Sequence, residues 1–164
     1  MRLERRLYSR SELAAEFARL RSKPRPPRIV LANGCFDLLH VGHLRYLEDA
    51  RSRGDLLVVA LNTDASVRML KGAGRPLVPL MERAELLLGL SVVGAVTSFD
   101  EPTLEATLRE LRPDVHAKGT DYSKESVPEA AIDRELGIEI AICGDSKAHA
   151  SSEIIARLAR EPRA

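Results

Sequence analysis

Two histidines, His40 and His43, stand three residues apart in an eleven-residue segment that begins at Asn33. An apolar run at residues 29–32 precedes this segment and predicts a buried strand. Apolar residues at helical spacing follow it and predict a helix that begins near Val41. A strand, a loop and a helix in this order aim backbone N–H groups at a phosphate. Because one histidine ends the loop and the other lies in the first helical turn, we expect both imidazoles to face one anion.

Three small residues of the same segment bear on its chemistry. Gly34 lies in the loop, where a glycine lets the backbone approach a phosphate. Gly42 lies between the histidines and has no side chain, so a nucleotide can lie directly against the helix start. Cys35 has no partner base nearby in the sequence, and we therefore do not expect a covalent mechanism.

Alternating strands and helices are predicted to position this corner. The predicted strands are 29–32, 55–61, 92–97, 113–117 and 138–143. The predicted helices are 9–20, 41–54, 81–90, 100–111, a segment within 123–136, and a last helix that starts near Ser151. This alternation predicts an α/β protein with a Rossmann-like, doubly wound, five-stranded parallel sheet and helices on both faces. We expect one domain over residues 1–164, in which residues 1–27 are an N-terminal helix and linker.

Composition excludes several classes of protein. The formal net charge of +1 does not suggest a nucleic-acid or membrane surface. The two cysteines fit no metal-ligand spacing and indicate a reducing compartment. The longest apolar region, residues 84–96, is shorter than the ~20 residues that a membrane span needs. Charged residues near the start interrupt any signal peptide, so we expect a cytoplasmic protein.

The segment from Gly34 to Asp37, followed by His-Val-Gly-His at 40–43, resembles the signature of the cytidylyltransferase-like nucleotidyltransferase superfamily. Within it, the chain resembles the adenylyltransferases of heptose 1-phosphate over residues 9–158. The segments that carry this second resemblance are Asn33-Gly34-Cys35-Phe36, Lys71-Gly72 followed by Arg75-Pro76, and Lys118-Gly119. The resemblance implies transfer of AMP from ATP, with Mg²⁺ accompanying the triphosphate, to a phosphorylated sugar or polyol. It is also compatible with a homodimer.

In such a transfer, a phosphate oxygen of the acceptor attacks the α-phosphorus of the nucleoside triphosphate in line and expels pyrophosphate. The attacking oxygen is already anionic, so catalysis depends on alignment and on stabilising the developing charge. His40 and His43 suit this role as hydrogen-bond donors to the phosphates, although structural or capping histidines are the alternative. Lys118 follows a predicted strand end and is the third candidate catalytic residue, because its cation can neutralise phosphate charge.

The binding residues fall into two predicted sets. The nucleotide set implied by the resemblance comprises Gly34, Cys35, Phe36, Gly42, Arg83, Gly119, Ser151 and Ser152. Its two serines open the last helix, where hydroxyls and free N–H groups bind phosphates. The acceptor set follows the first two predicted strands and comprises Asp37, Asn62, Asp64, Lys71 and Arg75. The role of Asp37 stays open between sugar hydroxyls, a magnesium ion and bracing the loop. No residue is predicted as a dedicated metal ligand.

Two positions depart from the heptose-enzyme pattern. Thr120 replaces the second glycine of a Lys-Gly-Gly-Asp-Tyr segment, and Ala150 stands where the family often has a further serine. His149, just upstream, is positioned to supply a donor to the same phosphates. Both departures lie on the predicted nucleotide side.

Other functions remain open at this stage. The superfamily also includes cytidylyltransferases of glycerol phosphate and ethanolamine phosphate and the FAD synthetases. Class I aminoacyl-tRNA synthetases share a His-x-Gly-His element, but this chain is too short for their tRNA-binding domains. A non-catalytic nucleotide sensor is a third alternative, against which both histidines, Lys118 and the serine pair argue. Heptose adenylyltransferases are often fused to a sugar kinase, for which the chain has no room, so we expect a separate kinase to supply the acceptor.

Overall fold

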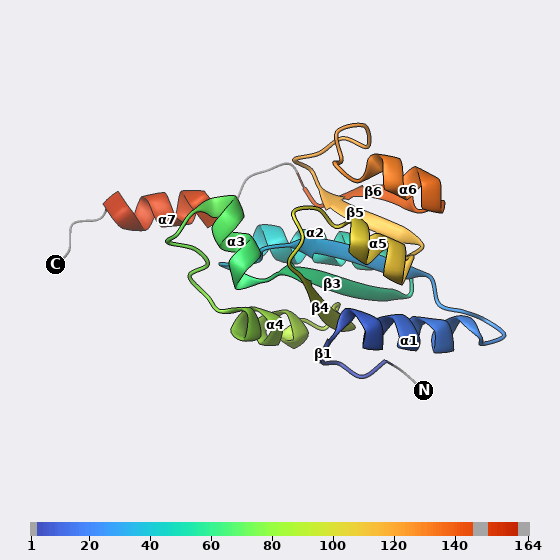
Figure 1. Ribbon diagram of the computed structural model, residues 1–164. Coiled ribbons are helices and arrows are strands. Elements are labelled where there is room, and N and C mark those ends of the chain that lie inside the picture. The colour runs from blue at the N-terminus through green and yellow to red at the C-terminus, as the bar shows by residue number, and fades with distance from the viewer. Residues whose placement is uncertain (1–2, 146–150, 161–164) are drawn as a thin grey trace.

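A single parallel sheet forms the centre of the protein, and its strand order is β1-β4-β3-β2-β5-β6 (Figure 1). The computed structural model describes residues 3–145 and 151–160, except the side chains of residues 151 and 152. The strands are β1 (Leu7–Tyr8), β2 (Ile29–Gly34), β3 (Leu56–Asn62), β4 (Ala95–Phe99), β5 (Val115–Gly119) and β6 (Glu139–Cys143). The chain runs outward from β2 to β3 and β4 on one side, and β5 and β6 lie on its other side. The strand order therefore reverses at β2, and ligands bind beside the carboxyl ends of strands at such a point.

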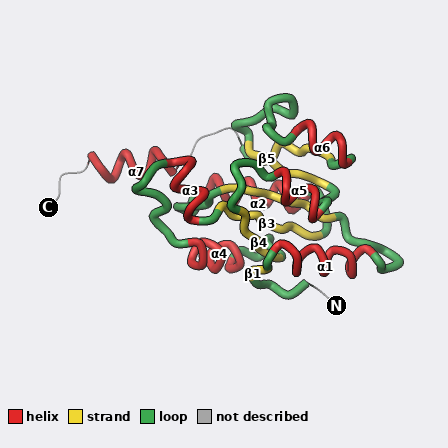
Figure 2. The backbone as a smooth tube through the Cα atoms, viewed as in Figure 1, coloured by secondary structure: helices red, strands yellow, loops and turns green. Residues whose placement is uncertain are grey.

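Helices cover both faces of the sheet (Figure 2). They are α1 (Arg10–Arg21), α2 (Val41–Ser52), α3 (Asp64–Lys71), α4 (Leu80–Gly89), α5 (Glu105–Leu111), α6 (Ala130–Leu136) and α7 (Ser151–Arg160). Apolar side chains of α2 and α4 pack on one face of the central strands, and those of α1, α5 and α6 pack on the other. Alternate residues of β2 enter the two apolar clusters, which explains its continuous apolar sequence. None of the described helices is long and apolar enough to cross a membrane.

The predicted α/β fold with a doubly wound parallel sheet is confirmed, but the predicted number of strands is wrong by one. The additional strand, β1, consists of Leu7 and Tyr8 paired with Val96 and Thr97 at the edge of the sheet. Two residues are too few to produce a periodic pattern, so this strand could not be predicted from the sequence.

Four further elements differ from the predictions. A helix, α3, was not expected, yet Thr63 caps it by accepting a hydrogen bond from Ser66 N. Helix α5 begins at Glu105 rather than near Asp100, because other elements hold the preceding loop. Asp100 accepts a hydrogen bond from the Thr63 hydroxyl, and Glu101 pairs with Arg10 at 2.7 Å. The third predicted strand, 92–97, is shifted to 95–99, and the segment 123–136 forms a helix only over α6.

The turn from α2 into β3 requires a glycine at position 54. A Cβ atom there would lie 2.6 Å from the carbonyl oxygen of Arg28 and 2.7 Å from a methyl group of Val30. The same carbonyl accepts hydrogen bonds from the N–H groups of Asp55 and Leu56, so it is fixed by the start of β3. This close approach sets how α2 returns to the sheet.

We expect Gly54→Ala to lower the free energy of unfolding by about 1–3 kcal/mol, because the backbone itself must move. Gly89→Ala is the matched control, since a Cβ atom at this position meets nothing within 4 Å. Gly89 is the last residue of α4, and alanine is favoured in helices. Urea denaturation of both variants measures the difference. Equal stability of the two variants would show that the α2–β3 turn tolerates a side chain.

Candidate functional site

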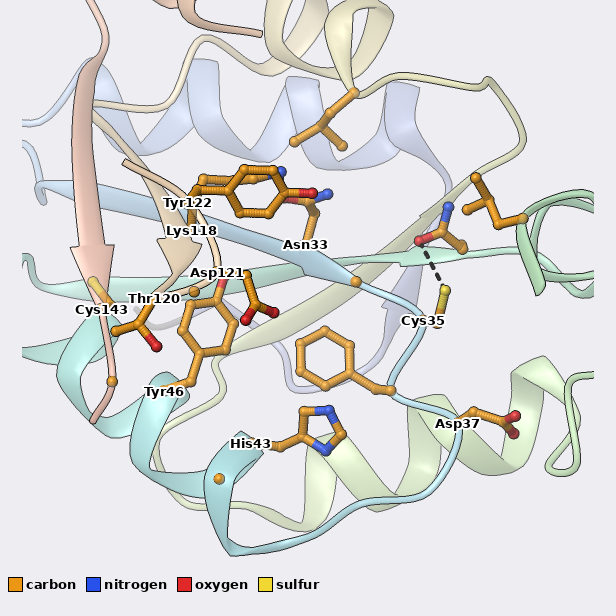
Figure 3. A pocket seen from close by; sticks show the side chains of 18 of the residues that line it. Asn33, Cys35, Asp37, His43, Tyr46, Lys118, Thr120, Asp121, Tyr122 and Cys143 are labelled. Carbon is orange, nitrogen blue, oxygen red and sulfur yellow. Dashed lines mark hydrogen bonds between the residues drawn. The ribbon is translucent and has the colours of Figure 1, made fainter. Parts of the chain in front are cut away.

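One cavity of about 930 Å³ lies at the carboxyl ends of the central strands, where the strand order reverses (Figure 3). Most of the residues predicted from the sequence line it. They are Gly34, Cys35, Phe36, Asp37, His40, Gly42, His43, Asn62, Lys71, Arg75, Lys118 and Gly119. Arg83 and Asp64 do not line it. The side chains of Ser151 and Ser152, together with His149 and Ala150, lie outside the described residues, so their predicted role remains a prediction.

His40 is the N-cap residue of α2, and its imidazole has a defined hydrogen bond. Its Nδ1 accepts the N–H of Gly42 at 3.1 Å while its backbone is extended. An Nδ1 atom that accepts carries no proton, so the proton of the neutral ring is on Nε2. The ring of His43 stacks on that of His40 with 3.9 Å between centroids. The predicted pair therefore forms one unit at the helix start.

His43 is an uncharged donor in this site. Burial, followed by the nearby His40 and Lys71, lowers its pKa to about 4, although a hydrogen bond with the Leu38 backbone opposes the shift. At neutral pH this ring consequently carries no net charge. A neutral imidazole has one N–H and can meet a phosphate only by hydrogen bonding, not as a cation.

Phe36 packs behind the two histidines and requires an unusual backbone. It adopts a left-handed conformation with φ of 46°, which is uncommon for a residue with a side chain. Its ring lies 5.1 Å from that of His43 and 6.3 Å from that of Tyr46. A Cβ atom at position 34 would lie 3.0 Å from the Phe36 ring, so Gly34 provides space for this ring. In this structure Gly34 thus serves the packing of the loop.

Two contacts attach α2 to the opposite side of the cavity. The Tyr46 hydroxyl donates a hydrogen bond to the carbonyl oxygen of Ala117 on β5 at 2.7 Å, and burial raises the pKa of this phenol. Asp49 accepts a hydrogen bond from Gly144 N, just beyond β6, at 2.9 Å. The histidines are thereby held at a fixed position relative to β5, which carries Lys118.

Lys118 lies at the centre of the cavity and is only 6% exposed. Its ammonium group donates to Asn33 Oδ1 at 3.3 Å and to Glu129 Oε2 at 3.5 Å. It also lies 4.8 Å from the centre of the Tyr122 ring, as the close-up in Figure 3 illustrates. Lys118 is therefore a paired cation that faces the same space as the histidines.

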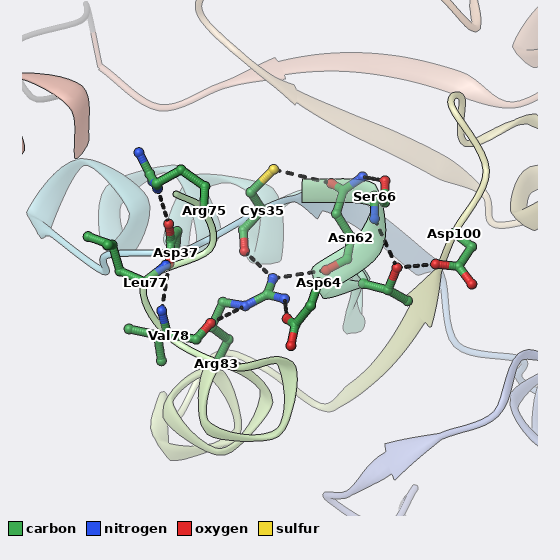
Figure 4. A network of polar contacts seen from close by, with 11 residues as sticks. Cys35, Asp37, Asn62, Asp64, Ser66, Arg75, Leu77, Val78, Arg83 and Asp100 are labelled. Atoms are coloured by element: carbon green, nitrogen blue, oxygen red, sulfur yellow. Dashed lines mark hydrogen bonds and ion pairs between the residues drawn. The ribbon is translucent and has the colours of Figure 1, made fainter. Parts of the chain in front are cut away.

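On the acceptor side, Asp37 braces the loop instead of presenting a free carboxylate (Figure 4). Its oxygens accept hydrogen bonds from Arg75 Nε at 2.5 Å and from the N–H groups of Leu77 and Val78 at 2.7 and 2.9 Å. Burial alone would raise the pKa of Asp37, but these donors hold it below its usual range. Three protein donors engage this carboxylate, which favours bracing the loop among the three roles that the sequence left open for Asp37.

Arg75, by contrast, is oriented into the cavity by that pairing. Its Nε is engaged by Asp37, whereas its buried Nη2 has no partner among the described residues. An unpaired guanidinium nitrogen in a cavity wall is suited to an anion such as phosphate. Lys71, at the end of α3, lines the same side of the cavity.

Arg83 was predicted to reach the nucleotide phosphates, and the structure corrects this expectation. Its side chain is fully buried and donates to the carbonyl oxygens of Val78, Cys35 and Asn62 at 2.9, 2.6 and 2.9 Å. Its remaining nitrogen pairs with Asp64 at 2.7 Å (Figure 4). Asp64 therefore serves this internal pair and not the acceptor.

Asn62 and Cys35 contact each other at the cavity wall. Asn62 donates to the Ser66 hydroxyl at 2.9 Å and accepts from Cys35 Sγ at 3.6 Å. Burial raises the pKa of the Cys35 thiol, which reduces its nucleophilicity at neutral pH. We therefore assign both residues a structural role in the cavity wall.

Sequence reasoning missed several residues of the site. Tyr46, Glu129 and the side chain of Asn33 line the cavity, and none was predicted to act there. Asn33 alone had a usable signal, because it ends a predicted strand at the edge where ligands bind. Glu129 lies in a polar segment that has no periodicity, so only the tertiary fold brings it to Lys118.

Fold and site together define an α/β enzyme that handles nucleotide phosphates at the switch point of a parallel sheet. A family model described as cytidylyltransferase-like matches residues 31–157. The chain belongs to this family and is a nucleotidyltransferase.

Individual relatives agree with this assignment. The bifunctional protein HldE of Streptomyces coelicolor is 47% identical over 135 residues, which are 82% of this chain and 29% of that protein. The bifunctional protein HldE of Geotalea uraniireducens is 50% identical over 127 residues, which are 76% of this chain and 26% of that protein. The chain thus spans less than a third of the length of these relatives. A crystal structure of a lipopolysaccharide core biosynthesis protein from Thermoplasma volcanium is similar with a TM-score of 0.63 and 30% identity, covering 74% of this chain and 99% of that chain.

The buried position of Arg83 leads to a stability prediction. We expect Arg83→Met to lower the free energy of unfolding by at least about 2 kcal/mol, because three buried carbonyl groups lose their donor. Arg109→Met is the control, since Arg109 pairs with Glu135 on the surface and such pairs contribute less than about 1 kcal/mol. Denaturant unfolding measures both. A stable Arg83→Met protein with weakened nucleotide binding would restore the role predicted from the sequence.

The lowered pKa of His43 leads to a prediction about pH. In the unfolded chain its pKa is about 6.5, so between pH 6.5 and pH 4 the unfolded state binds a proton that the folded state does not. Its contribution to stability is therefore full above this range and is lost as the pH falls through it. We expect His43→Asn to show a shallower loss of stability between pH 7 and pH 4.5 in urea unfolding. Parallel curves for the variant and the unmodified protein would contradict the low pKa.

Proposed function

We propose that this chain transfers AMP from ATP to heptose 1-phosphate with release of pyrophosphate. The observation that carries the proposal is that one cavity unites the His40–His43 pair, Lys118 and the unpaired guanidinium edge of Arg75. The identity to bifunctional proteins named HldE and the likeness to a lipopolysaccharide core biosynthesis protein support a sugar-phosphate acceptor. The segments that resemble heptose 1-phosphate adenylyltransferases support the choice of ATP.

The reaction requires two phosphates to meet in line. An oxygen of the acceptor phosphate forms a bond to the α-phosphorus, and the bond from that phosphorus to the oxygen that bridges it to the β-phosphorus breaks. The electron pair of the broken bond leaves with pyrophosphate, and no proton transfer is needed. His40 Nε2–H donates to the α- and β-phosphates, where charge develops, and the neutral ring of His43 stacks against that of His40. Lys118 balances the charge between the two substrates.

The acceptor phosphate binds at Arg75 and Lys71 in this proposal. Arg75 is held by Asp37, so its free edge is preorganised before substrate arrives. The sugar then extends along the wall formed by Asn62, Phe99 and Thr103. This wall combines an aromatic surface with polar groups, a common arrangement in small-molecule sites.

Mg²⁺ enters this proposal with the triphosphate. Among the described residues, no group of three or more His, Cys, Asp or Glu side chains converges to hold a metal. Asp37 is not available, because its carboxylate already accepts three hydrogen bonds. The donor set therefore fits an ion that keeps several waters and is bound by phosphate oxygens, as Mg²⁺ commonly is. When bound, it neutralises part of the phosphate charge.

The deciding measurement is kcat/KM for ATP and CTP, each with heptose 1-phosphate, glycerol 3-phosphate and phosphoethanolamine, read as pyrophosphate. We expect ATP with heptose 1-phosphate to have the highest value. His40→Ala is the control, because loss of a transition-state donor lowers kcat by about 10²–10³-fold. A dominant cytidylyl product of glycerol phosphate or phosphoethanolamine would overturn the proposed substrates. Unchanged turnover in the folded His40→Ala variant would overturn the proposed site.

A further inference from the structure

Beneath the cavity, five polar side chains form one buried chain of contacts that ends at Lys118. Asp133 Oδ2 lies 2.8 Å from His116 Nδ1, and His116 Nε2 lies 3.4 Å from Asn33 Oδ1. Asn33 Oδ1 also accepts from Lys118, which contacts Glu129 at its other side. The His116 and Asp133 side chains are both 0% exposed. No step of the proposed reaction uses His116 or Asp133, although burying ionisable groups is costly.

The fold explains why these residues meet. His116 and Lys118 are two residues apart on β5, so their side chains share one face of the strand. The parallel pairing of β2 with β5 places Leu31 beside His116, so Asn33, two residues later, lies beside Lys118. Glu129 is the N-cap residue of α6, and Asp133 follows one turn later. The start of α6 thus presents one carboxylate to Lys118 and one to His116.

The hydrogen bonds define where the protons are. A proton must lie between His116 Nδ1 and the Asp133 carboxylate, because at 2.8 Å two lone pairs would repel. Lys118 has only donors, so the oxygen of the Asn33 amide must face it. The same oxygen faces His116 Nε2, and this nitrogen must therefore also carry a proton. The alternative, an Asn33 amide turned by 180°, would place its NH₂ group against the ammonium group.

From this geometry we infer that His116 is a positioning residue for Lys118: its Nε2–H holds the Asn33 amide so that the oxygen faces the ammonium group. When that proton is absent, Nε2 accepts from Asn33 instead, and the amide turns its NH₂ group toward Lys118. The cation then loses one of its two oxygen partners. The inference deepens the proposed function, because it states what keeps Lys118 directed at the phosphates.

The charged groups around His116 are compatible with a doubly protonated ring. Asp133 approaches from α6, Lys118 lies beyond Asn33 on the same face, and Glu129 lies beyond Lys118. Burial would raise the pKa of Glu129, but Lys118, the N–H of Leu104 and the nearby His116 lower it. Two carboxylates thus compensate two cations, and the buried group is neutral as a whole.

The first test measures the protons directly and is independent of catalysis. In ¹⁵N spectra of the unmodified protein at pH 7, we expect both ring nitrogens of His116 to carry protons, whereas the ring of His43 is neutral and serves as the internal reference. His116→Leu assigns the signals. A bare Nε2 on His116 would overturn the inference, whether or not the chain proves to be an adenylyltransferase.

The second test asks whether His116 acts through Lys118. We expect His116→Leu to lower kcat about tenfold with little change in KM for ATP. In a Lys118→Met background, the same substitution should change kcat less than twofold, because the effects of coupled residues are not additive. Thr97→Val is the matched control, since it removes a buried hydrogen bond to Tyr8 on the far side of the sheet. It should change kcat less than twofold in both backgrounds.

A full tenfold effect of His116→Leu in the Lys118→Met background would overturn the inference, because His116 would then act independently of the lysine. If no acceptor is turned over, the ¹⁵N spectra decide alone, because they require no catalysis. Failure of the proposed function is thereby distinguished from failure of this inference. If His116→Leu does not fold, His116→Gln assigns the signals instead, and the spectra of the unmodified protein still decide.

Discussion

The buried guanidinium group of Arg83 is the interaction on which the acceptor half of the site depends. It joins the loop after β2, the end of β3, the start of α3 and the segment that enters α4. A guanidinium group cannot lose its charge in a protein, and its planar donors accept only a narrow range of partner positions. Three carbonyl groups and Asp64 are therefore fixed together. The two loops that contain Asp37 and Arg75 are built on this frame.

The nucleotide half is fixed by different means. Tyr46 and Asp49 attach α2 to β5 and to the turn after β6. The imidazole of His40 accepts a hydrogen bond from the N–H of Gly42 in the first turn of α2. The two halves meet at the central strands, where Lys118 lies, and they share the loop after β2, which contains Asp37 and leads to His40. The division suits a transferase, because each substrate phosphate meets a wall that is rigid before binding, and a single cation lies between them.

Local chemistry was predictable from the sequence, and long-range burial was not. His40, His43 and Gly42 act within one turn of chain, so spacing alone located the corner. Arg83 was predicted to bind because it matches an arginine that recurs in the family, and Asp37 because it lies in the phosphate loop. Their actual partners lie up to 48 residues away in the sequence. The strand β1 and the helix α3 escaped prediction because they are short and are stabilised by one strand pairing and one cap. Ser151 and Ser152 remain as predicted from the sequence alone.

The neutral ring of His43 affects how the site responds to dissolved ions. Cations on a surface attract phosphates over a distance, and added salt screens that attraction within about 10 Å at 0.1 M. A hydrogen bond from an uncharged imidazole acts only at contact and is hardly screened. A phosphate-binding site that relies partly on neutral rings consequently loses less nucleotide affinity as ionic strength rises than a site built from lysine and arginine alone.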